Sequence, residues 1–127
     1  MNEEKQKEVI EAYLAAYNRF DVEGMIAQLH PQIVFQNVSD GEVNAEANGI
    51  EQFREMAVRS AAMFSSRHQQ ASEFSADGAV VSIEIAYEGI LATNLPNGMQ
   101  AGETLQLTGR SEFIFEDGKL IRITDFS

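Results

Sequence analysis

Several residue types that build common functional sites are absent or scarce in this chain. There is no cysteine, which excludes disulfide bonds, thiolate metal ligands and cysteine nucleophiles. The only two histidines, His30 and His68, are far apart, and neither has a partner at metal-ligand spacing. No glycine-rich phosphate loop follows a strand-like run, and no serine occupies a nucleophile-elbow pattern. We therefore expect no metal, no cofactor and no nucleotide.

Basic residues are also few. Nine Lys and Arg face twenty Asp and Glu, so the net charge is −11, and the basic residues are scattered. This charge opposes binding to nucleic acid or to an anionic membrane surface. The apolar runs are far too short to span a bilayer, and no apolar signal-peptide core follows the charged start of the chain. We expect a soluble, cytoplasmic protein with no nucleic-acid or membrane partner.

The 127 residues fit one domain, 1–127, because no linker, repeat or low-complexity segment divides them. Three helical segments come first. The first, Glu3 to Arg19, has an apolar stripe with spacings of one, three and four residues: Val9, Ile10, Tyr13, Leu14 and Tyr17. Asp21 is predicted to cap a second helix over Val22 to Leu29, which Pro31 ends. Asn48 and Glu51 have the form of a capping box that opens a third helix to about Phe64.

Five runs of the chain predict β-strands: Gln32 to Val38, Arg67 to Phe74, Ala79 to Leu91, Thr104 to Phe115, and Leu120 to Phe126. The last three are predicted to form an antiparallel meander, because Asp117-Gly118 is a strong hairpin signal. Ser39 to Ala47 is interpreted as a polar loop. Helices followed by such a sheet indicate an α+β fold, with three helices packed on a curved, mostly antiparallel sheet and room for a pocket between them.

Four polar residues interrupt the faces that should be apolar. In strand phase, Asn37 follows Ile33 and Phe35, Ser111 lies between apolar neighbours, and Asp125 follows Ile121 and Ile123. Tyr13 lies on the inner stripe of the first helix. A buried polar group without a partner costs about 1–3 kcal/mol. These groups therefore satisfy one another, bind ordered water, or line a ligand cavity, and each is also compatible with a purely structural place in the core.

The same residues resemble the nuclear transport factor 2-like superfamily. The resemblance rests on YLAAYNRFDVEGMIAQLHPQIVF at 13–35, NGIEQF at 48–53, and GETLQLTG and FIFEDGKLIR at 102–109 and 113–122. The last two are similar to the closing hairpin of the SnoaL-like polyketide-cyclase branch. The resemblance implies a cone-shaped α+β barrel with a hydrophobic pocket at its wide end. It also implies a homodimer through the outer sheet face, where the apolar Val34, Val38 and Ile114 are predicted to lie.

The related ketosteroid isomerases show which catalytic roles the resemblance can transfer. Alignment places their oxyanion tyrosine on Tyr13, their general base on Asn37 and their protonated aspartate on Ser111. An amide cannot take a proton from carbon at neutral pH, so we expect no standard ketosteroid isomerase activity on 3-oxo-Δ5 steroids. The polyketide-cyclase branch uses an aspartate as acid and base, and the inward Asp125 is the nearest candidate.

Two hypotheses follow for function. In the first, the protein is a cofactor-independent isomerase or cyclase that performs acid–base chemistry on a small apolar carbonyl compound. Its catalytic residues are then Tyr13, Asn37 and Asp125, and its substrate-binding residues are Phe35, Phe53, Tyr87, Ser111 and Phe113. In the second, the same fold is a non-catalytic ligand-binding or protein-interaction module. The two differ on Asp125, which an enzyme needs inside the pocket.

Overall fold

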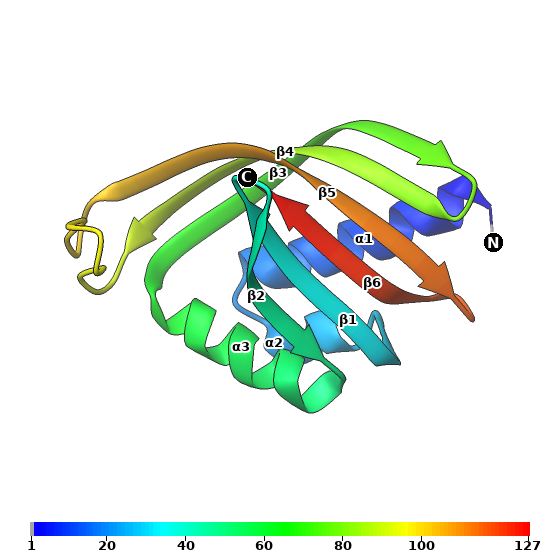
Figure 1. The fold of residues 1–127 in the computed structure, drawn as a ribbon, viewed down its shortest axis with the longest axis horizontal. Coiled ribbons are helices and arrows are strands. Elements are labelled where there is room, and N and C mark those ends of the chain that lie inside the picture. Colours follow the sequence, from blue (N-terminus) through cyan, green and yellow to red (C-terminus); the bar gives the residue numbers. More distant parts are fainter. Residues whose placement is uncertain (1) are drawn as a thin grey trace.

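The computed structural model describes residues 2–127, which form three helices and six strands (Figure 1). The helices are α1 (Glu3–Asn18), α2 (Val22–Ile26) and α3 (Ile50–Ala62). The strands are β1 (Leu29–Ser39), β2 (Glu42–Asn48), β3 (Phe64–Asp77), β4 (Val80–Leu91), β5 (Thr104–Glu116) and β6 (Lys119–Phe126). Among residues 2–127, no helix has the length and apolar character needed to cross a bilayer.

The six strands form one curved sheet in the order β2-β1-β6-β5-β4-β3. Only β1 and β6 are parallel, and every other neighbouring pair is antiparallel. The strands arch over the helices, which cover one face of the sheet (Figure 1). The predicted α+β fold, with three helices on a curved and mostly antiparallel sheet, is confirmed, and so is the closing meander.

The core lies between the helices and this face of the sheet. Its largest fully buried side chains are Phe53, Phe113, Ile10, Ile33, Ile83, Leu91, Leu120, Ile123 and Val81. Each such side chain contributes roughly 1.5–3 kcal/mol of hydrophobic stabilisation when it is removed from water. The apolar stripe of α1 and the alternating faces of β1 and β4 supply most of the core, as their sequence periods predict.

The predicted loop over residues 39–47 is wrong, because most of it forms β2. β2 pairs antiparallel with β1, and the two strands join through Asp40 and Gly41, whose φ values are +53° and +79°. Two successive positive φ values are typical of the tight turn that matches strand twist. In β2 only Ala47 is buried, since this is an edge strand. Its sequence does alternate polar with apolar residues, but two of its three apolar positions are alanine, which is depleted in strands, so the signal is weak.

Two helix boundaries also differ from the prediction. α2 ends at Ile26, before Pro31. Pro31 instead lies inside β1, where the pairing of β1 with β6 is irregular. A proline is tolerated there because its missing N–H removes no hydrogen bond between the strands. One of the two predicted helix caps is confirmed, because Asp21 Oδ1 accepts a hydrogen bond from the Gly24 N–H at 2.9 Å. The other is wrong, because Asn48 does not cap α3. The α3 cap is Gly49, whose φ of +85° lets the chain turn sharply out of β2.

The inward face of β6 is also shifted from its predicted phase. Ile114 pairs with Arg122, whereas Phe115 pairs with Leu120, so Ile121 is an extra residue at a β-bulge. As a result Leu120 is fully buried beside Ile123, and Ile121 is only partly buried. Strict alternation predicted Ile121 inward, because a bulge changes the phase without a local sequence signal.

This bulge predicts unequal costs for two neighbouring truncations. Leu120→Ala should lower the free energy of unfolding by about 2–5 kcal/mol, because it leaves a cavity in the core. Ile121→Ala should lower it by about 1 kcal/mol or less. Urea denaturation of both variants and the wild type measures the difference, and a larger loss for Ile121→Ala would contradict the bulge.

Candidate functional site

A cavity of about 500 Å³ lies between the helices and the sheet. Its wall is mainly apolar and aromatic, with Tyr13, Tyr17, Met25, Phe53, Met56 and Met63 from the helical side and Phe35, Ile85, Tyr87 and Leu105 from the strands. Unbranched methionine side chains adapt their shape easily, so three of them in one wall favour a ligand that is apolar and variable in outline.

Polar groups from three neighbouring strands meet on one side of this cavity. In the sheet, Asn37 of β1 pairs with Asp125 of β6, and Asp125 pairs with Ser111 of β5. All three line the cavity. The Ser111 hydroxyl donates to Asp125 Oδ1 at 2.7 Å, and Asn37 Nδ2 donates to Asn44 Oδ1 at 2.9 Å. The pairing thus produces a row of amide, carboxyl and hydroxyl groups in an apolar wall.

The Asp125 carboxyl is the group with proton-transfer chemistry in this row. Burial raises its pKa to about 6, and the hydrogen bond from Ser111 acts in the opposite direction by favouring the carboxylate. A carboxyl with a pKa near neutrality can both accept and return a proton at physiological pH. Asp125 can therefore serve as a general base or a general acid.

The end of β6 is held in place by backbone contacts. The Ser127 N–H donates to the Val38 carbonyl oxygen at 3.0 Å, and Figure 1 shows the C-terminus beside the tip of the β1–β2 hairpin. On the other side, a Cβ atom at Gly109 would lie 2.3 Å from the Phe126 carbonyl oxygen. Only glycine allows β5 to approach the strand end this closely, so Gly109 helps to set the position of the neighbouring Asp125.

Three tyrosines line the same cavity. Burial, followed by the negative charge of Asp125, raises the pKa of Tyr13 well above its ordinary value, so Tyr13 remains a neutral phenol that can donate a hydrogen bond. Its ring packs against Phe53 and edge-on to Phe113, with centroid separations of 6.4 and 6.3 Å. The hydroxyls of Tyr17 and Tyr87 are hydrogen-bonded to each other at 3.0 Å.

The structure brings together most of the site residues proposed from the sequence. Tyr13, Phe35, Asn37, Phe53, Tyr87, Ser111 and Asp125 all line the cavity. Phe113 does not, because it lies in the core behind Tyr13 and is only 1% exposed. Tyr17 and Arg67 line the cavity but were not proposed. Tyr17 had a sequence signal, since it follows Tyr13 by four residues on the same helical stripe.

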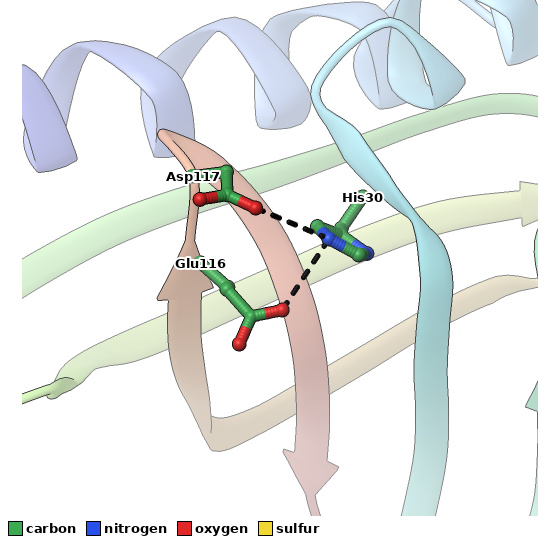
Figure 2. A group of neighbouring side chains, drawn as sticks. All are labelled: His30, Glu116 and Asp117. Atoms are coloured by element: carbon green, nitrogen blue, oxygen red, sulfur yellow. Dashed lines mark ion pairs between the residues drawn. The ribbon is translucent and has the colours of Figure 1, made fainter.

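A second cluster lies at the start of β1, at the opposite end of the strand from Asn37. Figure 2 shows His30 Nε2 between carboxylate oxygens of Glu116, at 3.4 Å, and Asp117, at 3.8 Å. His30 Nδ1 accepts from the Gln32 N–H at 3.0 Å, so the ring proton is on Nε2 and points towards the carboxylates. A metal would need the lone pair of that nitrogen. The geometry therefore favours a polar contact between the Nε2–H of His30 and the carboxylates of the β5–β6 turn over a metal site.

Comparison with known families agrees with this architecture. The family model for the SnoaL-like domain matches residues 10–123. The chain belongs to this family. The resemblance found in the sequence is thereby confirmed for this SnoaL-like protein. A search among curated proteins finds no match to the chain.

Solved structures share the fold of this SnoaL-like domain. A candidate polyketide cyclase of Xanthomonas campestris pv. campestris has a TM-score of 0.85 and 23% identity, over 100% of this chain and 93% of that one. A candidate SnoaL-like polyketide cyclase of Jannaschia sp. CCS1 has a TM-score of 0.80 and 14% identity, over 96% and 84%. TerC, co-crystallised with polyporic acid, has a TM-score of 0.76 and 22% identity, over 95% and 89%. At such low identity these similarities show the fold alone.

The raised pKa of Asp125 predicts how stability depends on pH. The folded pKa of about 6 exceeds the ordinary 3.8, so the folded protein binds this proton more tightly than the unfolded chain does. The stabilising effect is complete below pH 4 and is lost as the pH rises through 6. Asp125→Asn should therefore be more stable than the wild type by about 1–3 kcal/mol at pH 8, and nearly equal to it at pH 4.

Urea denaturation at the two pH values measures this gap. The matched control is Asp40→Asn, which neutralises an exposed carboxyl at a turn position that asparagine also tolerates. The control should show no gap that opens with pH. A difference between Asp125→Asn and the wild type that is as large at pH 4 as at pH 8 would contradict the assignment.

Proposed function

We propose that this SnoaL-like protein is a cofactor-independent isomerase or cyclase that acts on a small, largely apolar carbonyl compound. The observation that carries the proposal is the Asp125 carboxyl, with a pKa near 6, in the same apolar cavity as the neutral phenol of Tyr13. A base and a hydrogen-bond donor that face one cavity are the two groups that enolisation of a carbonyl compound requires.

The proposed step is a proton transfer from carbon. The Asp125 carboxylate takes a proton from the carbon next to the substrate carbonyl, and the electron pair of the broken C–H bond moves into an enolate. Tyr13 donates a hydrogen bond to the enolate oxygen, where negative charge develops. In an isomerisation, protonated Asp125 returns the proton to another carbon of the conjugated system. In a cyclisation, the enolate carbon attacks a second carbonyl of the same molecule, and the resulting alkoxide takes the proton.

Two further residues support these roles. The Ser111 hydroxyl, 2.7 Å from Asp125 Oδ1, orients the carboxyl and stabilises its anion. Asn37, in register beside Asp125, contributes an amide that can hold the substrate carbonyl but cannot act as a base. TerC, a protein of the same fold, was co-crystallised with the small molecule polyporic acid, and this supports a small-molecule function here.

A second candidate is a non-catalytic ligand-binding module. The observation that favours it is the Ser111–Asp125 hydrogen bond, because a buried carboxyl that already has a partner needs no catalytic role. On this hypothesis Asn37, Ser111 and Tyr13 only orient a bound molecule. The two candidates differ in whether the protein accelerates proton transfer from a ligand that it binds.

Deuterium exchange into 2-tetralone tests the proposal, because this bicyclic apolar ketone has acidic C–H bonds next to its carbonyl. We expect the wild type to accelerate loss of the C1 proton signal in D₂O above the buffer rate, as followed by proton NMR. Asp125→Asn should reduce the protein-dependent rate by about 10²–10⁴-fold, the usual contribution of a general base. Tyr13→Phe should reduce it less, since the apolar cavity remains.

Glu84→Gln is the control, since this carboxylate is exposed on the outward face of β4. It should leave the exchange rate unchanged. If 2-tetralone raises the melting temperature of the wild type but its exchange is not accelerated, the catalytic proposal fails and the binding module is supported. An undiminished rate in Asp125→Asn would exclude Asp125 as the base.

We also propose that the protein forms a homodimer through the outer face of the sheet, as the family resemblance implies. Three apolar residues of β1 and β5 remain partly exposed in the monomer: Val34, Val38 and Ile114. Sedimentation velocity at micromolar concentration should show a species of twice the chain mass. The variant Val34→Glu should shift it to the monomer, because a charge would be desolvated in the interface. A wild-type monomer would refute the proposal.

A further inference from the structure

Arg67 of β3 is a buried cation whose hydrogen-bonding groups are only partly used. Its residue exposure is 5%, and it lines the cavity. Its Nε donates to the Tyr17 carbonyl oxygen at 3.0 Å. Neither Nη1 nor Nη2 has a hydrogen-bond partner among residues 2–127. A buried charged group left in this condition is costly, since burial removes its hydration without replacing it.

The surroundings of Arg67 explain how the guanidinium is held but not why its Nη edge is unpartnered. The guanidinium carbon lies 3.7 Å from the centre of the Tyr17 ring and 4.6 Å from that of Phe20. These cation–π contacts stabilise the charge at its faces. The Tyr17 carbonyl belongs to the last turn of α1, where the helix dipole also favours a cation. The planar fork of Nη donors is therefore held in place, and both of its nitrogens are buried without an acceptor among the described residues.

A second donor lies in the same part of the cavity. The hydroxyls of Tyr17 and Tyr87 share one hydrogen bond, so whichever of them donates, the proton of the other remains for a ligand. Burial raises the pKa of both groups, and the positive charge of Arg67 opposes this rise. The phenols stay neutral donors. Arg67 and this tyrosine pair together form a site that would stabilise an anion.

Tyr87 of this site and Asp125 lie in different rows of the sheet. Tyr87 pairs with Leu107, and Asp125 pairs with Ser111, which is four residues further along β5. At about 3.3 Å per residue the two rows are about 13 Å apart along the strand, which is roughly the length of three fused six-membered rings. A molecule of that length can place one end at Arg67 and the other at Asp125.

We propose that Arg67 binds the carboxylate of the ligand, so that the ligands of this cavity are apolar polycyclic carboxylic acids rather than neutral compounds. The guanidinium fork matches a carboxylate with two parallel N–H···O bonds, and the tyrosine pair adds a third donor. The proposal rests on the proposed function only in identifying the far end of the ligand as the reacting end. Binding of the acid itself does not require catalysis.

Two fluorescent probes of matched shape test this proposal: anthracene-2-carboxylic acid and anthracene-2-carboxamide, titrated with the protein at pH 8 by fluorescence anisotropy. We expect the wild type to bind the carboxylate at least 10-fold more tightly than the neutral amide. Arg67→Gln should remove this preference by raising the Kd of the acid about 10–100-fold while changing that of the amide less than 2-fold. Arg67→Lys, which keeps the charge but not the fork, should retain part of it.

The control is Arg59→Gln, which removes the same charge from an exposed position of α3 and should preserve the preference. Equal affinity of the wild type for both probes, binding of neither, or a preference that survives Arg67→Gln would each overturn the proposal. If Arg67→Gln does not fold, the wild-type preference and its reduction in Arg67→Lys decide the matter. Asp125→Asn should keep the preference. A wild type that shows the preference but does not accelerate ketone exchange would refute the catalytic proposal and leave this one standing.

Discussion

The parallel pairing of β1 with β6 is the contact on which the cavity depends. It joins the first half of the chain to the closing meander and places Asn37 beside Asp125, while the antiparallel pairing of β6 with β5 adds Ser111. Because side chains alternate between the two faces of a strand, a slip of one residue in either pairing would turn one of these groups out of the cavity. The reactive groups are therefore positioned by backbone hydrogen bonds. The Ser127–Val38 bond and the close approach at Gly109 hold the end of that arrangement.

Burial affects a carboxyl and a guanidinium of the cavity in different ways. The carboxyl of Asp125 responds by raising its pKa to about 6, so its charge depends on pH and its proton can be exchanged. The guanidinium of Arg67 cannot lose its proton at physiological pH, so it stays charged and is stabilised by the rings of Tyr17 and Phe20. Both arrangements lower the stability of the fold relative to an apolar core. Such a loss of stability is expected at a functional site, where residues are selected for ligand binding rather than for maximal stability.

Much of this fold could be predicted from local sequence patterns. The stripe of α1 follows from its helical period, and the inward phase of Asn37 and Ser111 follows from alternation, because faces are a local property of helices and extended strands. Asp117-Gly118 marks its hairpin with φ values of +53° and +77°. Even the missed strand β2 carried a sign in Asp40-Gly41 and in its alternation, but alanine, which is depleted in strands, supplies two of its three apolar positions.

The sequence by itself determined the α+β class, the meander and which side chains point inward along regular strands, since these depend on residues close together in the chain. Only the tertiary structure decided what depends on distant segments. The bulge at Ile121 buries Leu120 through the register of β5 against β6, and Phe113 lies behind Tyr13 rather than in the cavity wall. Arg67 shows the limit most clearly, because β3 is polar on both faces and gives no sign of burial. Its guanidinium is enclosed by the end of α1, and only the packing of that helix against the strand can place a cation there.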